Sequence, residues 1–438
     1  MKKRTNPLRA ILLGFLSVIV IGCVLLLLPF SAKQPLSFID ALFMSTSAVC
    51  VTGLSVVSIG NFTLFGQLVI LILIQIGGLG YMSVTSFLLL SFKKKLSYED
   101  KLILKESLNY PTMHNLVDFF KRILLFVAIS EIVGAILLSF VFYQKYGLLG
   151  VYYGIFHAVS AFNNAGFSLF RDSLISYRYD ILVNFVIMSL IVLGGIGFLV
   201  VDELLLFKSK KITRISLHTR VVLSSTAFLI LFGAFFIFLL ERKGILHNHG
   251  FMYDMLVSLF QSITARTAGF NSVDISNMHS STIFLFVILM FIGASPSGTG
   301  GGVKTTTAFV VFLAIYSFIR GERETIAFKR KIPNNIIERS FVIFSLSSIF
   351  VVFVSFILSD IEKFPFLDIL FEAVSAISTV GLSVGNNLSL SASFDTVGKI
   401  VIMMLMFIGR VGIFTFSIAL LKKRVSRRYK LPEGRILL

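Results

Sequence analysis

The sequence has few charged side chains for its length. Only 14% of its 438 residues are charged, 56% are hydrophobic, and the mean hydropathy is +0.91. A soluble protein of this length would need far more polar surface. Apolar runs recur along the chain, and each approaches the roughly 20 residues that a helix needs to cross a bilayer. We therefore predict an all-α polytopic membrane protein, in which the first run, 11–30, is a retained span.

The sequence is also poor in residues that build disulfides, metal sites and active sites. Its two cysteines, Cys23 and Cys50, have neither metal-ligand spacing nor the number needed for a disulfide framework. The six histidines are scattered and form no HExxH motif. No catalytic constellation of these residue types appears in the apolar runs. We expect a protein that is not an enzyme and has no covalently bound cofactor.

Acidic residues are outnumbered by basic ones, 22 to 40, and the formal net charge is +18. Most basic residues fall in five clusters, which alternate with loops that contain far fewer: 1–9, 93–122, 208–220, 320–339 and the tail from Lys422. This positive-inside pattern predicts cytoplasmic N- and C-termini in a cell-membrane protein. Contact with anionic membrane lipids explains the clusters without nucleic acid, and a docking surface for a cytosolic partner is compatible with it.

Four segments of the chain align on a glycine. They read FIDALFMSTSAVCVTGLS, YGIFHAVSAFNNAGFS, YDMLVSLFQSITARTAGFN and FLDILFEAVSAISTVGLS, with the glycines Gly53, Gly166, Gly269 and Gly381. A serine lies six residues before the glycine in three copies and seven before it in the third: Ser47, Ser160, Ser375 and Ser262. A repeat of this kind predicts four copies of one structural unit.

Each glycine segment lies between two apolar spans. The stretch 38–51 before the first glycine would be about 21 Å long as a helix, too short for the roughly 30 Å of hydrocarbon. It must enter and leave on the outer side, because the flanking basic clusters are cytoplasmic. We predict four span–re-entrant pore loop–span (M1-P-M2) repeats around a central pore, with eight transmembrane helices. The repeats are 1–95, 96–208, 209–325 and 326–438, and the pore loops 38–55, 152–168, 252–271 and 366–383.

The residues next to the four glycines are short of charge, so backbone carbonyls are the natural lining. Inward carbonyls replace the hydration shell of a cation, glycine permits the required positive φ, and the helix C-termini add negative potential. We predict a monovalent cation filter of Val51, Thr52, Gly53, Asn164, Ala165, Gly166, Thr267, Ala268, Gly269, Thr379, Val380 and Gly381. The alternative, glycines that only allow close helix packing, fits one copy better than four in register.

These motifs resemble a known family. The four units with their filter glycines, the TARTAGFN of the third segment and the loop GASPSGTGGGVKT are similar to the Trk/Ktr/HKT superfamily of potassium transporters, in particular its KtrB-type membrane subunits. The resemblance implies potassium uptake, since glycine at all four filter positions goes with potassium preference. It also implies a homodimer, a cytosolic ring of nucleotide-binding, RCK-type regulatory subunits, and Na⁺ dependence in many members.

The stretch FIGASPSGTGGGVKTTT, 291–307, interrupts the second span of the third repeat. A phosphate-binding Walker A motif needs glycine directly before its lysine, and Val303 stands there instead. The apolar arms 281–292 and 308–319 are too short to span alone, so this irregular backbone must lie at membrane depth, where it lines a cavity or packs on protein. We predict a gate at 293–307, with a static kink as the alternative; its residues are Gly298, Gly300, Gly301, Gly302, Lys304 and Arg410.

Charged residues inside apolar segments are functional candidates. We expect Arg266 to support the filter from behind, and Arg410 to face the pore as a barrier or to contact the third-repeat loop. Glu131 and Glu372 are expected to anchor neighbouring backbone or basic groups, and Asp202 and Glu203 to be solvated. The rival function is an ion-coupled cation carrier (K⁺/Na⁺ or K⁺/H⁺ symport), although repeats of one orientation favour a central pore. A non-transporting scaffold is the third class.

Overall fold

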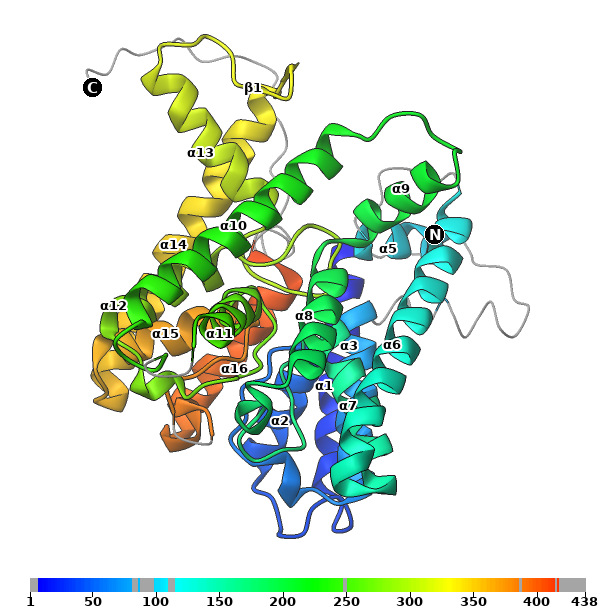
Figure 1. The fold of residues 1–438 in the computed structure, drawn as a ribbon, viewed down its shortest axis with the longest axis vertical. Coiled ribbons are helices and arrows are strands. Elements are labelled where there is room, and N and C mark those ends of the chain that lie inside the picture. Colours follow the sequence, from blue (N-terminus) through cyan, green and yellow to red (C-terminus); the bar gives the residue numbers. More distant parts are fainter. Residues whose placement is uncertain are drawn as a thin grey trace, which may run out of the picture.

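The computed structural model describes residues 7–80, 86, 98–108, 115–246, 250–385, 388–413 and 416 (Figure 1). Helices and the loops between them account for nearly all of this part of the chain, which confirms the all-α fold class. Its one sheet is a short antiparallel hairpin of β1 (Ile326–Ala327) and β2 (Arg330–Lys331). The predicted basic tail from Lys422 lies outside the described residues.

Four long helices begin the four repeats: α1 (Pro7–Leu27), α6 (Leu116–Tyr146), α10 (Leu217–Glu241) and α14 (Asn334–Glu362). In the described part of the chain, these are the single helices long and apolar enough to cross a bilayer. Large apolar side chains on them remain exposed, for example Leu13, Phe140 and Phe356. Such an apolar outer surface suits contact with lipid rather than water.

A short, deeply buried helix follows each long one: α2 (Phe38–Cys50), α7 (Leu148–Phe162), α11 (Phe251–Thr264) and α15 (Phe366–Ile377). Three of them carry an aspartate in the first turn, where the helix dipole favours negative charge. The cap of α2 is formed by Ser37, whose hydroxyl accepts from the Asp40 N–H at 3.1 Å. Each of these helices ends just before one of the four aligned glycines.

The second apolar helix of each repeat is α3 (Leu64–Leu79), α8 (Ile181–Gly195), α12 (Ser280–Phe291) and α16 (Thr396–Val411). α3 and α16 are capped by a glycine of positive φ, Gly80 (82°) and Gly412 (91°), and α8 ends two residues before another, Gly197 (98°). A right-handed helix does not continue through such a residue. The interruption expected in the third copy is therefore not confined to it. In the second copy, α8 and α9 (Phe198–Lys208) meet at a 98° bend, and together they would make a fifth span.

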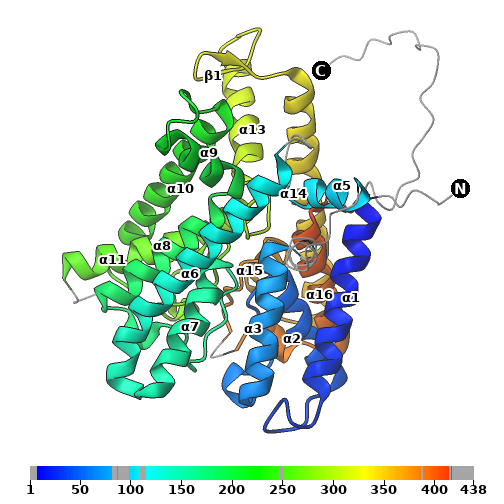
Figure 2. The ribbon, with the colours of Figure 1, turned by 90° about the vertical axis from the view of Figure 1, so that its right-hand side faces the viewer.

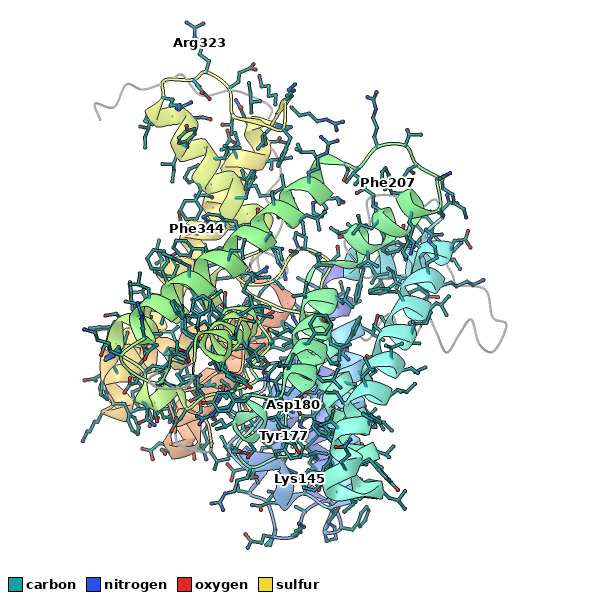
Figure 3. All side chains as sticks on the ribbon, viewed as in Figure 1. Lys145, Tyr177, Asp180, Phe207, Arg323 and Phe344 are labelled. Carbon is teal, nitrogen blue, oxygen red and sulfur yellow. The ribbon has the colours of Figure 1, made fainter. Side chains whose placement is uncertain are left out.

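The remaining elements are connections. α5 (Tyr98–Ser107) lies between the first two repeats, and α13 (Thr305–Ile319) continues the third after the interrupted stretch. Short 3₁₀ turns follow the glycine segments: η1 (Ile59–Asn61), η2 (Ile175–Tyr177), η3 (Ile275–Asn277) and η4 (Leu390–Ser393). Figure 2 shows α13, β1 and part of α14 extending from one end of the molecule. In Figure 3 Arg323 marks that end, whereas Lys145 and Tyr177 lie toward the other.

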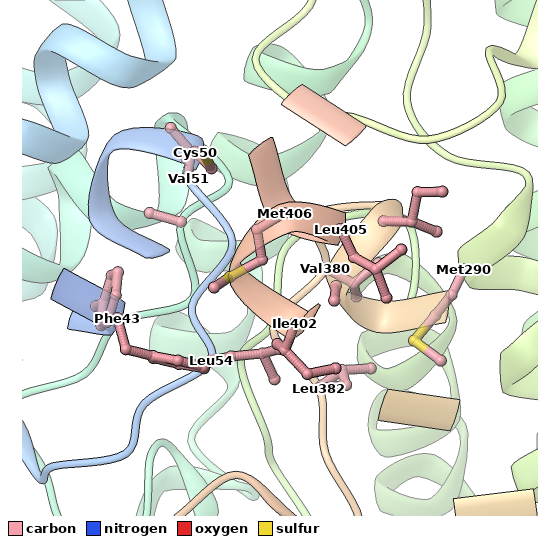
Figure 4. Close-up of a cluster of buried hydrophobic side chains, with 14 of the residues drawn as sticks. Phe43, Cys50, Val51, Leu54, Met290, Val380, Leu382, Ile402, Leu405 and Met406 are labelled. Carbon is pink, nitrogen blue, oxygen red and sulfur yellow. The ribbon is translucent and has the colours of Figure 1, made fainter. Parts of the chain in front are cut away.

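The repeats pack in a closed cycle. The second helix of each repeat contacts the short helix of the next: α3 contacts α7, α8 contacts α11, α12 contacts α15, and α16 contacts α2. The last of these contacts joins the end of the chain to its beginning. Figure 4 shows this closure, where Ile402, Leu405 and Met406 of α16 lie beside Val51 and Val380. The cycle places the four glycine segments around one axis.

Candidate functional site

The four aligned glycines meet at the centre of the cycle and form what we call the glycine ring (Gly53, Gly166, Gly269, Gly381). A Cβ atom added to any of them would strike the carbonyl oxygen of the residue before the next glycine: Ala165 for Gly53, Ala268 for Gly166, Val380 for Gly269 and Thr52 for Gly381. Each ring glycine thus packs against the segment of the next repeat, and the fourth packs against the first, so the ring is closed. No side chain larger than hydrogen fits at these four positions without a shift of the backbone.

The backbone of the four ring segments (51–53, 164–166, 267–269 and 379–381) follows one pattern. The first and third residues have positive φ, for example 56° at Val51 and 95° at Gly53, and the residue between them does not. Alternation of left- and right-handed backbone turns successive amide groups toward one side and successive carbonyls toward the other. The structure thus brings together all twelve residues of the predicted filter in a carbonyl-rich ring; their ion-binding role remains a prediction.

A hydroxyl from each short helix holds its ring segment. The N–H groups of Gly53 and Gly381 donate to Ser47 and Ser375, each at 3.1 Å. In the other two copies Ser160 donates to the Phe167 carbonyl and Thr264 to the Phe270 carbonyl, both at 2.8 Å. The third copy departs from the sequence alignment, because Thr264 and not Ser262 has this place; Ser262 donates instead to the Ile230 carbonyl of α10 at 2.7 Å.

Outside the ring, three copies carry a further hydrogen bond that sequence reasoning missed. A polar side chain of the short helix contacts a serine after the ring segment: His157 with Ser168 at 2.9 Å, Gln261 with Ser272 at 3.0 Å and Glu372 with Ser383 at 2.6 Å. Glu372 also accepts from the Ser391 N–H at 2.9 Å, so it anchors backbone as expected. Polar residues eight or nine positions before the glycine are the signal for these contacts.

Two cavities of about 300 Å³ each lie on opposite sides of the ring and the interrupted stretch. One is lined by all four ring glycines and by loops with Ser55, Ser168, Asp172 and Asp274. The other is lined by glycines of the interrupted stretch and of the second helices, together with Lys304, Arg410 and Arg339. A path between the two cavities would have to pass through the ring and then the interrupted stretch.

The interrupted stretch, 293–304, lies directly against the ring segments; we call it the third-repeat loop. The Gly301 N–H donates to Thr379 Oγ1 at 2.9 Å, and a Cβ at Gly300 would strike the Thr267 hydroxyl. The loop is also bonded to the second repeat, because the Thr299 N–H donates to the Gly194 carbonyl at 3.2 Å. It therefore forms an ordered layer between the ring and the second cavity.

Arg410 and Lys304 bind carbonyls of this layer. The Arg410 guanidinium donates through Nη1 to the Thr299 carbonyl and through Nη2 to the Gly77 carbonyl, with a further bond of 3.1 Å to Gly78. Lys304 Nζ donates to the Gly300 carbonyl at 2.7 Å. Of the two expectations for Arg410, contact with the third-repeat loop is observed, and the same side chain joins that loop to α3.

Other predicted charges lie elsewhere. Arg266 is buried behind the third ring segment beside α8 and α10, and its Nε has no hydrogen-bond partner among the described residues. Asp202 is buried in an ion pair with Arg122, 2.6 Å between Oδ1 and Nε, and Glu203 accepts from Ser216 Oγ at 2.7 Å. The expectation of solvation is wrong for Asp202, because the bend at Gly197 turns α9 back toward α6 and α10, whereas Glu203 stays half-exposed.

Comparisons with known proteins agree with this architecture. A family model described as "TrkH: Cation transport protein" matches residues 10–430. The chain is 41% identical to Ktr system potassium uptake protein B of Bacillus subtilis, over 99% of this chain and 97% of the relative. It is 38% identical to the potassium/sodium uptake protein NtpJ of Enterococcus hirae, over 100% of this chain and 98% of the relative.

The fold also resembles a solved structure. The crystal structure of the potassium transporter TrkH from Vibrio parahaemolyticus superposes with a TM-score of 0.75 and covers 96% of this chain and 86% of that one. Sequence identity in this match is 18%, so the likeness concerns the fold.

Proposed function

The chain belongs to the TrkH family of cation transport proteins, and from that premise we propose that it is a potassium uptake protein of the cell membrane. The observation that carries the proposal is the closed ring of four glycine segments. A ring of backbone carbonyls replaces the hydration shell of a monovalent cation. A divalent-cation filter would more often present carboxylates, and the ring segments contain none. The relatives named for potassium uptake share nearly the full length of the chain.

We propose eight transmembrane segments in four M1-P-M2 repeats. Four are the long helices α1, α6, α10 and α14. The other four are composite: each begins as a short apolar helix and changes direction at its glycines, as α8 does before α9 and α12 before α13. The short buried helices would then enter and leave on the outer face, which places the first cavity outside and the second on the cytoplasmic side with both termini.

The third-repeat loop is the proposed gate. It lies between the ring and the second cavity, and its residues Gly298, Gly300, Gly301 and Gly302 give it a backbone that can rearrange without side-chain clashes. Arg410 holds the loop to α3 through carbonyl groups, and a cation at this depth opposes passage of another cation. Movement of the loop and of Arg410 together would open the path.

Partners follow from the family. The names of the B. subtilis and Vibrio alginolyticus relatives refer to a Ktr system, which supports a second, regulatory component. We propose a homodimer on a cytosolic, nucleotide-binding ring, with basic cytoplasmic segments as its docking surface. The E. hirae relative is named for both potassium and sodium uptake. We propose that sodium affects potassium uptake by this chain or shares its path.

Growth of a potassium-uptake-deficient bacterial strain tests the proposal. Expression of the chain, together with a Ktr-type regulatory subunit, should restore growth at low external K⁺. A variant that lacks residues 366–383 keeps the membrane helices but removes one ring segment, and serves as the negative control. Full-length protein that reaches the membrane and still gives no rescue would contradict potassium uptake and leave a scaffold role.

A further inference from the structure

The residue three positions before each ring glycine is buried beside its ring segment. These residues are Cys50, Asn163, Arg266 and Ser378, and all four are buried. Asn163 differs from the other three because, among the described residues, it alone is bonded to a carboxylate. It is also the C-cap of α7 and directly precedes Asn164, whose φ of 57° starts the second ring segment. Its side chain is therefore placed where a small displacement would move that segment.

Three elements meet at Asn163. Its amide Nδ2 donates to Glu131 Oε1 at 3.0 Å and to Gln75 Oε1 at 2.8 Å. Gln75 Nε2 donates in turn to Glu131 Oε2 at 3.2 Å. Glu131 comes from α6, Gln75 from α3 and Asn163 from α7, so this Glu131 cluster (Glu131, Gln75, Asn163) joins two repeats behind the ring.

Glu131 has an unusual setting. It lies in the middle of the long helix α6, where its neighbours Ile132 and Val133 are exposed in an apolar surface. Within the described residues it forms no ion pair, and both of its oxygens are bonded to side-chain amides. Ionisable residues at such depth are costly and are retained for a function.

We propose that Glu131 is a positioning residue, which fixes the second ring segment through Asn163 and thereby contributes to the preference of the ring for K⁺ over Na⁺. This inference rests on the proposed potassium uptake. K⁺ and Na⁺ differ in size, so a carbonyl ring distinguishes them only while its geometry and its number of carbonyl ligands are maintained. Charge-assisted hydrogen bonds are about twice as strong as neutral ones, which suits a group that must hold a backbone segment in place.

The same cluster supports the carbonyls that bind Arg410. A Cβ at Gly78 would collide with Asn163 Oδ1, so Asn163 packs tightly on this turn of α3. The Gly78 carbonyl accepts from Arg410 Nη2 at 3.1 Å. The Glu131 cluster therefore contacts the ring segment on one side and the arginine-bound turn of α3 on the other.

Replacement of Glu131 by glutamine keeps the shape of the side chain but turns one of its two acceptors into a donor. That donor would face the amide group of Gln75 or of Asn163. Asn163 cannot turn over to compensate, because its Nδ2 also donates to the Val159 carbonyl at 2.9 Å. The mismatch is therefore expected to displace Asn163 and the ring segment after it.

The test is the ratio of K⁺ to Na⁺ uptake in proteoliposomes that contain the full chain and its regulatory subunit. Glu131→Gln should lower this ratio by about threefold to tenfold, as expected when a charge-assisted hydrogen bond is lost. Glu241→Gln, the same change in a buried carboxylate that caps the start of α12, is the control and should leave the ratio unchanged. An unchanged ratio in Glu131→Gln would overturn the proposal.

A double-mutant comparison separates positioning from general damage. Asn163→Asp places two carboxylates face to face and should lower the ratio, and adding Glu131→Gln to it should raise the ratio again. Additive losses would contradict the proposed pairing. If Glu131→Gln gives no folded protein, Gln75→Leu tests the same cluster and should also lower the K⁺/Na⁺ uptake ratio. An unchanged ratio in Gln75→Leu would likewise contradict the positioning role of Glu131. Wild-type protein without K⁺ uptake would instead refute the proposed function itself.

Discussion

At the scale of single residues, the ring depends on eight backbone positions of positive φ, and only four of them are glycines. The others are Val51, Asn164, Thr267 and Thr379, with φ between 51° and 71°. Left-handed backbone at a non-glycine residue costs on the order of 1 kcal/mol or more, and for β-branched residues it is a genuine outlier. The hydroxyls of the short helices and the packing of the neighbouring repeats offset this strain. Strain that is maintained in four copies supports a function for the ring.

Gly381→Ser should abolish the preference for K⁺. The new Cβ would strike the Thr52 carbonyl and would have to adopt a φ of 92°, so the first and fourth ring segments must move apart. We expect the K⁺/Na⁺ uptake ratio to fall about tenfold or more, which corresponds to roughly 1.4 kcal/mol.

Gly250→Ser is the matched control for this substitution. Gly250 has a nearly equal φ of 89°, but no atom lies within 4 Å of a Cβ there. Serine at this position imposes similar backbone strain without touching the ring, so the K⁺/Na⁺ uptake ratio of the Gly250→Ser variant should stay at the wild-type value. If the Gly381→Ser variant still takes up K⁺ in preference to Na⁺, the ring is not the filter.

Arg410→Ala should raise K⁺ flux several-fold. The substitution removes a half-buried cation from the proposed path and releases the Thr299, Gly77 and Gly78 carbonyls, so both the barrier and the attachment of the third-repeat loop are lost. Initial rates of K⁺ uptake measure the effect. Lys399→Met, near the start of the same helix, removes a cation that pairs with Asp40 and should leave the rate unchanged. Wild-type kinetics in Arg410→Ala would exclude the barrier role.

Some of the residues that build the ring could be predicted from the sequence, and others could not. Four glycines in register predicted the ring, because no other residue type fits those positions. The Glu131 cluster could not be predicted, since its partners are set by how helices from different parts of the chain pack. The polar residues His157, Gln261 and Glu372 recur at similar positions before the glycine, but their serine partners could not be identified without the path of the chain after the ring. Thr264 was missed because the third copy has one residue fewer between the helix hydroxyl and the glycine.

At the scale of elements, the short helices and the interrupted second helices define the site. The length of 38–51 predicted a helix too short to cross, and α2 has that form. The interruption of the second apolar helix in the third repeat could also be predicted, because its glycines leave no continuous helical pattern. The 98° bend between α8 and α9 could not be predicted, since glycines are common in membrane helices and only the φ of 98° at Gly197 shows the break.

Deletion of 294–302 should increase K⁺ flux and weaken its regulation. The deletion removes the layer that separates the ring from the second cavity, including the Thr299 carbonyl bound by Arg410. Uptake rates with and without the regulatory subunit report both effects. Replacement of the same nine residues by glycine and serine keeps the length of the chain and should retain part of the barrier. A folded deletion variant with normal, regulated flux would favour a static kink.

At the scale of the whole molecule, the chain closes on itself around one axis. Contact of α16 with α2 completes the cycle, because the second helix of the fourth repeat packs on the short helix of the first. A ring with four members therefore requires all four repeats, and no single repeat contains a site.

The most direct test of the account is radiotracer uptake of K⁺ and Na⁺ into proteoliposomes that contain the purified chain with its regulatory subunit. The account predicts K⁺ uptake that exceeds Na⁺ uptake and continues down a K⁺ gradient without a coupled gradient of Na⁺ or protons. The protein with Gly381→Ser should take up both ions alike. K⁺ entry that stops when the Na⁺ and proton gradients are removed would contradict a pore and favour a coupled carrier.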